Sequence, residues 1–496
     1  MIYVKMIGHN YIFELKEIIF QYFHKDSIKF LHEEDCFNVG RDYLIIIAIE
    51  KKYDYYDVYT VIEIEGKEIT KSKEQIPNII NSEKEVLYKL KVTLYNAMKS
   101  GFGHILPWGI LTGIRPSKIV HKLIDQGYDE NKIITTLNNH YLLSKEKTDL
   151  LINVVKNQRD IIYPIKKKSI SLYIGIPFCP SRCIYCSFLS SVLEKDKGIL
   201  KEYLDSLFFE IKEISKYIQK NNLKIETIYI GGGTPTILNQ EELNSLLYLI
   251  AQEINIKNIK EYTLEAGRPD TINKKKLKLS LQYGINRISI NPQTMDNNTL
   301  IKIGRNHSSE DIIRAFNLAR EVGFNFINMD LILGLPGEDK SRINNTLAHI
   351  KSLQPENLTI HIMSLKRGSK LSENINNYNF DQGKNILEMQ ETTRSFALNN
   401  GYQPYYLYRQ KYMLGNLENI GYCKNGYRSI YNILIMSEKQ TILGLGAGSV
   451  TKVFFPEEDR IERFPNVKDV RLYNNRIRGI IDKKLLLLDS LYSKNY

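Results

Sequence analysis

Between Ser169 and residue 362, short apolar runs rich in β-branched residues alternate with longer segments of helical periodicity. This rhythm is typical of repeated strand–helix units that build a parallel sheet. The repeats predict an α/β fold with a partial, open (βα)6 barrel of the TIM type. The predicted strands are residues 172–176, 227–230, 262–265, 287–290, 327–333 and 358–362.

A chain of 496 residues is long enough for two or three domains with a substantial core. Residues 1–165 combine a hairpin-like stretch with helical patterns, so we expect an N-terminal α+β domain there. The barrel is expected over residues 166–380. Residues 381–496 are expected to form a C-terminal extension that covers the substrate.

The composition favours a cytoplasmic protein. Five cysteines are too few for a secreted disulfide scaffold, and no apolar run reaches the roughly 18 residues of a membrane span. The formal charge of +12 would suit nucleic acid, a polycarboxylate or an acidic electron-transfer protein. Lysine is abundant throughout the chain, so we interpret the excess as a general bias and the short lysine runs as solvated surface.

The chemistry of the chain is concentrated in the spacing Cys179-x3-Cys183-x2-Cys186. Three thiolates fit a 4Fe-4S cluster, and they leave one iron open to a small molecule. Zinc is the main alternative, but a structural zinc site usually has four protein ligands. The other two cysteines, Cys36 and Cys423, are distant in sequence, and the loop contains no histidine. The spacing therefore favours the cluster over zinc.

Other chemically informative residues follow the predicted strands. The cysteine loop follows the first strand, the run 231–235 (Gly-Gly-Gly-Thr-Pro) follows the second, Glu265 ends the third, and Gln293 comes just after the fourth. In barrels of this type, reactive groups lie at the carboxyl ends of the strands. The positions of these residues therefore agree with the predicted fold.

The cysteine loop, with the preceding Tyr-Ile-Gly-Ile-Pro-Phe, resembles the signature of radical S-adenosylmethionine (SAM) enzymes. It is most similar to the oxygen-independent coproporphyrinogen III dehydrogenase family and to its HemZ-type branch, over residues 105–450. The resemblance implies a radical SAM barrel that holds a 4Fe-4S cluster and SAM. It also implies oxidative decarboxylation of two propionates of coproporphyrinogen III to vinyl groups. The basic charge of the chain would suit an acidic flavodoxin or ferredoxin as the electron donor.

The resemblance also implies roles for individual residues, although it identifies no catalytic residue. Cys179, Cys183 and Cys186 would hold the cluster. Glu265 would meet the SAM ammonium, Arg305 would pair with the SAM carboxylate, and Asp330 would bind the ribose hydroxyls. Tyr173 would contact SAM, and Tyr185 would lie near a second SAM. The remaining cofactor-binding positions are Gly232, Gly233 and Thr234 of the glycine run and Gln293.

This chain departs from the family pattern in one place. Many members have a further cysteine two residues after the third ligand, whereas this chain has Ser187-Phe188 there. The departure bears on how the substrate is handled, because that residue is not an iron ligand.

Two rival functions remain open: a haem-binding chaperone on the same fold, and a radical SAM enzyme acting on RNA or another substrate. The chaperones carry the signature His-Asn-x-x-Tyr-Trp, whereas residues 430–436 (Ile-Tyr-Asn-Ile-Leu-Ile-Met) lack its histidine and tryptophan. Only the basic charge favours RNA.

Two C-terminal motifs have open interpretations. The tyrosine-rich segment 402–411 would suit a flat, anionic tetrapyrrole, but tyrosines of this kind are equally typical of β packing. The run 444–449 (Gly-Leu-Gly-Ala-Gly-Ser) predicts a turn where the backbone can approach a ligand closely.

Overall fold

The computed structural model describes residues 1–23, 27–35, 41–78, 82–187, 191–192, 197–364, 366, 368–373, 384–410 and 413–493. The chain divides into two compact units, Met1–Ile152 and Asn153–Tyr496. Each unit is described by itself. The domain limits expected from the sequence, at residues 165 and 380, remain predictions.

The N-terminal unit contains a five-stranded sheet in the order β2-β1-β3-β4-β5, which is parallel across the first three strands and antiparallel beyond them. Its core is formed by the apolar faces of the sheet and of helices α1 and α2. The strands are β1 (Ile2–Ile7), β2 (Ile28–Leu31), β3 (Tyr43–Lys51), β4 (Tyr55–Ile64) and β5 (Lys67–Pro77). The helices are α1 (Ile12–Ile19), α2 (Glu83–Phe102), α3 (Ser117–Asp125) and α4 (Glu130–Thr135), with α5 (Lys145–Lys156) crossing into the next unit.

The C-terminal unit contains an eleven-stranded sheet in the order β14-β15-β13-β12-β11-β10-β9-β6-β16-β17-β18. The strands from β13 to β16 in this order are parallel, and an antiparallel pair extends each edge. The parallel strands are β6 (Ser169–Ile176), β9 (Lys224–Gly232), β10 (Glu261–Glu265), β11 (Arg287–Ser289), β12 (Ile327–Leu333), β13 (Asn357–Ile362) and β16 (Thr441–Leu445). The edge strands are β14 (Gln403–Tyr408), β15 (Asn419–Cys423), β17 (Val450–Phe455) and β18 (Arg460–Pro465).

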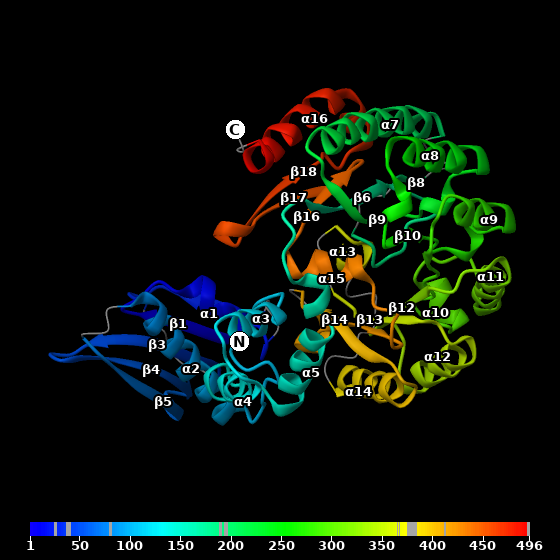
Figure 1. Ribbon diagram of the computed structural model, residues 1–496. Helices are drawn as coiled ribbons and strands as arrows, with labels where there is room; N and C mark the ends of the chain where they lie inside the picture. The colour runs from blue at the N-terminus through cyan, green and yellow to red at the C-terminus, as the bar shows by residue number, and fades with distance from the viewer. Residues whose placement is uncertain are drawn as a thin grey trace. The chain divides into compact units, whose positions relative to one another are not determined.

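Figure 1 shows α7 to α12 in an arc around the outside of this curved sheet, with α16 alongside α7. The helices cover the outer face of the parallel strands and the curvature of the sheet encloses the inner face, which fits the burial of seven of the eight residues of β6. The arc is formed by α7 (Lys197–Lys220), α8 (Gln240–Glu253), α9 (Lys274–Gln282), α10 (Asn297–Lys302), α11 (Ser309–Val322) and α12 (Lys340–Leu353). The other helices are α6 (Arg159–Ile162), α13 (Lys370–Glu373), α14 (Lys384–Asn399), α15 (Ile430–Ser437) and α16 (Val470–Tyr492).

Local sequence signals set where several of these helices begin. Asn239 and Glu242 form a reciprocal capping box at the start of α8, and Ser308 and Asp311 do the same for α11. The side chain of Asp469 caps α16. None of the helices in the described parts of the chain is both long and apolar enough to span a membrane.

The structure confirms the predicted α/β fold, with the open, barrel-like sheet and its six predicted strands. It adds a seventh parallel strand, β16, which the sequence analysis did not identify. β16 pairs with β6 through the register Thr441 to Ile170 and Leu445 to Ile174. As a result, the glycine-rich turn that follows β16 lies at the same end of the sheet as the cysteine loop that follows β6.

Candidate active site

The cysteine loop leaves the carboxyl end of β6 and is anchored to the loop that follows α10. Cys179 lies in the short strand β7 (Phe178–Cys179), which pairs with β8 (Ser191–Val192). Ser181 donates a hydrogen bond to the Gly304 carbonyl at 3.1 Å, and the Ile184 amide donates to the Ile303 carbonyl at 3.2 Å. Cys179, Cys183 and Cys186 form no disulfide with any described cysteine. They are therefore available as ligands on a loop whose backbone is fixed.

The glycine run packs directly against this loop. A Cβ added at Gly233 would lie 2.4 Å from the Phe178 carbonyl oxygen and 3.0 Å from Cys179 Sγ, so no side chain fits there. Gly232 has φ +114°, which also favours glycine. Thr234 Oγ1 lies 3.5 Å from Cys179 Sγ. The predicted positions Gly232, Gly233 and Thr234 therefore lie beside the first cluster cysteine.

Glu265 reaches back to the glycine run from the end of β10. Its carboxylate accepts hydrogen bonds from the Tyr229 hydroxyl at 2.6 Å and from the Gly232 amide at 3.2 Å. Burial, assisted by the charge of Asp330, raises its pKa to about 7, although these two hydrogen bonds favour the ionised form. A cationic ligand beside Glu265 would offset the cost of burying its charge.

Arg305 and Tyr185 meet at Cys183. Arg305 Nη1 donates to the carbonyls of Asn291 at 2.6 Å and Gly267 at 3.2 Å. Burial raises the pKa of the Tyr185 phenol, and the neighbouring Arg305 charge works in the opposite direction. Within the described part of the chain, the buried Arg305 Nε has no hydrogen-bond partner.

Gln293 and Asp330 are linked through their backbones, because the Gln293 amide donates to the Asp330 carbonyl at 2.8 Å. Gln293 has φ +67°, a conformation that is costly for a residue with a side chain. Its buried Oε1 accepts no hydrogen bond from the described residues. Asp330 lies in the middle of β12, where it accepts from Asn328 Nδ2 at 2.8 Å and lies 3.7 Å from His361 Nε2.

Five of the predicted residues line two neighbouring cavities. The outer cavity, of about 290 Å³, adjoins the cysteine loop and is lined by Tyr173, Gly232 and Gly233 among others. The inner cavity, of about 200 Å³, lies inside the sheet and is lined by Glu265 and Asp330 among others. The hydrogen bond between Gly232 and Glu265 joins their walls. Thr234, Tyr185, Gln293, Arg305 and the three cysteines line neither cavity.

The sequence analysis missed several residues at this site. Arg268 is buried and donates from Nη1 to Ser181 Oγ at 3.1 Å, with Cys183 Sγ at 4.0 Å. Arg268 follows Glu265, the last residue of a predicted strand, by three residues, so its position in the sequence could have identified it as a site residue. Tyr229 and Tyr431 stack with ring centroids 4.5 Å apart, and Tyr173 stacks on Tyr229 at 6.1 Å. No local sequence pattern predicts that Tyr431 of α15 joins this stack.

The structure supports β packing for the tyrosine-rich segment and places the glycine-rich turn next to a cavity. Tyr405 and Tyr406 of β14 are buried; the Tyr405 hydroxyl accepts from Asn432, and the Tyr406 hydroxyl donates to Thr359. They also line the inner cavity. The turn 446–449 forms a wall of the outer cavity.

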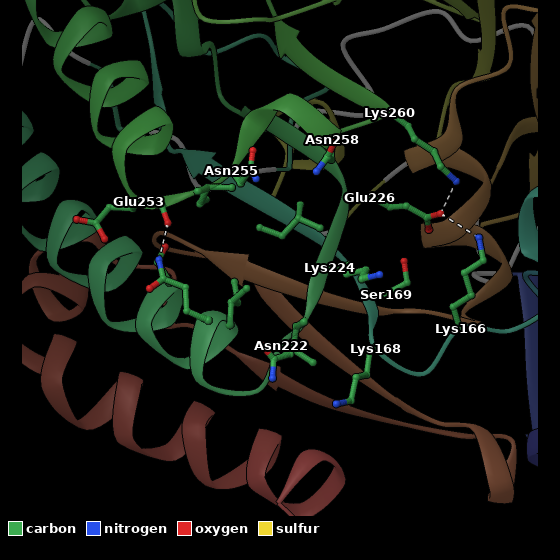
Figure 2. A pocket seen from close by; sticks show the side chains of 16 residues that line it. Lys166, Lys168, Ser169, Asn222, Lys224, Glu226, Glu253, Asn255, Asn258 and Lys260 are labelled. Carbon is green, nitrogen blue, oxygen red and sulfur yellow. Dashed lines mark hydrogen bonds and ion pairs between the residues drawn. The ribbon is translucent and has the colours of Figure 1, made fainter.

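A larger cavity of about 990 Å³ lies at the opposite end of the sheet, around the first residues of β6 and β9. Figure 2 shows Lys166 and Lys260 directed toward Glu226 at its edge. None of the predicted site residues lines it. We therefore assign the candidate site to the carboxyl end of the strands.

The arrangement fits a cluster that is bound together with a small polar cofactor. The three thiols offer the right donor chemistry, and the glycine run packs against their loop at a place where a Cβ would clash. Within the described part of the chain, no residue donates to Gln293 Oε1 and none accepts from Arg305 Nε. Among the described residues, no three His, Cys, Asp or Glu side chains are grouped to share a single metal ion.

Comparison with known proteins identifies the class. Residues 173–350 match the radical SAM superfamily. The solved structure of coproporphyrinogen III oxidase (HemN) from Escherichia coli, a radical SAM enzyme, superposes with a TM-score of 0.50 and 20% identity. That superposition covers 66% of this chain and 72% of HemN. The fold and the cysteine loop are those of a radical SAM protein, a class that uses a 4Fe-4S cluster and SAM.

More similar sequences identify the family. The chain is 39% identical over 462 residues to the oxygen-independent coproporphyrinogen-III oxidase-like protein HemZ of Bacillus subtilis (strain 168), with 91% of each chain covered. It is 31% identical over 281 residues to the heme chaperone HemW of the same organism, covering 56% of this chain and 70% of that relative. The chain belongs to the HemZ-like family of coproporphyrinogen III oxidase-like radical SAM proteins.

Proposed function

We propose that this protein is an oxygen-independent coproporphyrinogen III dehydrogenase, which converts two propionate side chains of its substrate into vinyl groups and yields protoporphyrinogen IX. The observation that carries the proposal is the likeness to HemZ over 91% of the chain, combined with a three-cysteine loop at the carboxyl end of the barrel strands. We further propose that it acts in the cytoplasm, where thiols stay reduced.

In this proposal, Cys179, Cys183 and Cys186 hold the cluster, and Gly233 allows the glycine run to pack closely against their loop. When bound and reduced, the cluster and SAM supply a 5'-deoxyadenosyl radical, which takes one hydrogen atom from the substrate. Glu265 meets the SAM ammonium, and Arg305 pairs with the SAM carboxylate. These contacts fix the reacting carbon against one substrate hydrogen, and the surrounding walls keep out water.

The proposed cofactor contacts extend to the remaining predicted residues. Asp330 binds the ribose hydroxyls, Gln293 offers its free Oε1, and Tyr173 packs against the cofactor. Tyr185 lies near a second SAM. Gly232 and Thr234 complete the glycine wall.

The reaction balances for each propionate. Overall, each propionate would lose one hydrogen atom, one electron and its carboxylate as CO₂, which leaves a vinyl group; the bound cluster and SAM would accept the hydrogen atom, and an external one-electron acceptor would take the electron. Each turnover also needs one electron to cleave SAM. We propose that an acidic flavodoxin or ferredoxin donates it, because a net charge of +12 favours association with acidic proteins.

The relatives named heme chaperone favour a second candidate function, haem delivery by the same fold. The chaperone signature is missing from residues 430–436, which form most of α15. In that helix Tyr431 is buried and stacks on Tyr229. We therefore rank the chaperone below the dehydrogenase.

An anaerobic assay distinguishes the candidates. The reconstituted protein is given SAM, a strong reductant and coproporphyrinogen III, and 5'-deoxyadenosine and the tetrapyrroles are followed by mass spectrometry. Formation of protoporphyrinogen IX that is lost in Cys183→Ala would support the dehydrogenase. SAM cleavage without decarboxylation would point to another substrate, and tight haem binding without cleavage would favour the chaperone.

A further inference from the structure

The outer cavity beside the cysteine loop is lined by two lysines, Lys366 and Lys468, and none of its described lining residues is acidic. It adjoins the cluster ligands, because Gly233 lies against Cys179 and Ser187 directly follows Cys186. Lys366 is close enough to Cys186 for their charges to interact. Two cations therefore face a cavity next to the reaction centre without a carboxylate in its described lining.

The wall that carries Lys468 is held rigidly. The Gly446 amide donates to Glu210 at 2.7 Å, and Tyr203 donates to the Gly175 carbonyl of β6 at 2.5 Å. The Gly448 amide then donates to the Val467 carbonyl at 2.9 Å, which fixes the backbone next to Lys468. Groups held in this way form a preorganised binding surface.

We infer that Lys366 and Lys468 bind a carboxylate of the substrate and thereby determine its orientation at the cluster. The inference rests on the proposed function, which supplies a substrate with four propionates. A carboxylate entering this cavity leaves water and needs cationic partners, and Lys366 and Lys468 provide two.

The bound carboxylate belongs to a propionate that is not reacting. The reacting carboxylate departs as neutral CO₂, so an ion pair with lysine would stabilise it more in the ground state than in the transition state. An anchor on a neighbouring propionate avoids this cost. Lys366 and Lys468 therefore act as positioning and specificity residues.

The test uses Lys366→Met, Lys468→Met and the double variant, with Lys168→Met as the matched control. Lys168 is an exposed lysine just before β6, at the far end of that strand, and Figure 2 shows it at the edge of the opposite cavity. Iron content and thermal unfolding check each variant. Binding is titrated with coproporphyrin III, a stable tetracarboxylate, and SAM affinity is measured separately.

We expect each single variant to weaken coproporphyrin binding about tenfold, which corresponds to about 1.4 kcal/mol. KM for coproporphyrinogen should rise more than kcat falls, and Lys→Arg variants should retain affinity because the charge remains. Lys168→Met should bind as the wild type does. Unchanged coproporphyrin affinity in the double variant would overturn the inference, and so would a loss confined to SAM affinity.

The same titration separates this inference from the proposed function. Wild-type protein that binds coproporphyrin through these lysines but forms no protoporphyrinogen would overturn the proposed reaction and leave the carboxylate site standing. Conversion that is intact in the double variant would leave the reaction standing and overturn the site. Wild-type protein that neither binds coproporphyrin nor forms protoporphyrinogen would overturn both.

Discussion

At Gly233, one hydrogen atom in place of a methyl group allows the glycine run to lie against the cysteine loop. Gly233→Ala would put a Cβ 2.4 Å from the Phe178 carbonyl and 3.0 Å from Cys179 Sγ. Overpacking of this kind costs about 1–3 kcal/mol, so we expect cluster loading to fall about tenfold. Iron content and visible absorbance after anaerobic reconstitution measure it.

Gly479→Ala is the matched control. A Cβ at Gly479, in α16, meets nothing within 4 Å, so this variant should load its cluster normally. Replacing a helix-interior glycine by alanine should even stabilise the protein slightly. Full cluster loading in Gly233→Ala would show that the loop moves aside easily and would contradict the packing argument.

Glu265 should make SAM affinity depend on pH. Burial raises its pKa to about 7, so below that pH the carboxyl is largely protonated and cannot pair with an ammonium. The ionised fraction rises about tenfold between pH 6 and pH 8, and the affinity for SAM should rise by the same factor. Equilibrium dialysis of the reconstituted protein measures this dependence.

Glu265→Gln provides the reference for this measurement, because glutamine has a similar shape and does not titrate. Any pH dependence that remains in the variant belongs to SAM itself or to other groups. If SAM affinity depended on pH in the same way in both proteins, Glu265 would not be the partner of the SAM ammonium. Weaker binding with a flat profile in the variant is the expected result.

Residue-level reasoning from the sequence succeeded where a motif follows a strand and failed where a partner comes from a distant element. Gly233, Thr234 and Glu265 could be predicted because each sits at a strand end. Arg268 was missed although its sequence position was informative. Tyr431 could not have been predicted, because its stacking on Tyr229 depends on how α15 packs on β9.

At the scale of elements, α7 and α16 are joined by a fully buried ion pair. Lys484 Nζ lies 2.5 Å from Glu210, which also accepts from Tyr473 at 2.6 Å and from the Gly446 amide. Lys484→Met would leave Glu210 charged and buried without its cation, and we expect a loss of about 3–5 kcal/mol in unfolding free energy. The guanidinium midpoint measures it.

Two further variants make this measurement specific. Glu210→Gln/Lys484→Met removes both charges and should recover much of the loss. Lys216→Met breaks an exposed pair with Glu213 and should cost less than about 1 kcal/mol. A Lys484→Met effect as small as that of Lys216→Met would mean that Glu210 protonates or rehydrates without difficulty.

The six strands expected from the sequence were found because each carries its own apolar run and precedes a helix. β16 was missed since Thr441–Leu445 lies far along the chain and only its long-range pairing with β6 makes it part of the parallel sheet. The turn after it lines the outer cavity, and the close approach of a ligand there remains a prediction. Its proximity to the cysteine loop follows from this pairing, which no local pattern encodes.

For the molecule as a whole, the net charge of +12 should govern the encounter with an acidic electron donor. Opposite net charges speed association at low salt, and this steering weakens as the Debye length falls from about 10 Å at 0.1 M to about 3 Å at 1 M. We expect the rate of cluster reduction by an acidic flavodoxin to fall about tenfold or more between these salt concentrations. Anaerobic stopped-flow absorbance measures the rate.

A neutral photoreductant in place of the flavodoxin is the control, because its encounter with the protein has no net electrostatic steering. Its reduction rate should change little over the same salt range, which separates the encounter from any effect of salt on the cluster. A flavodoxin rate that is equally insensitive to salt would mean that the basic residues act as solvated surface. The excess of lysine would then be a property of composition alone and would play no part in electron transfer.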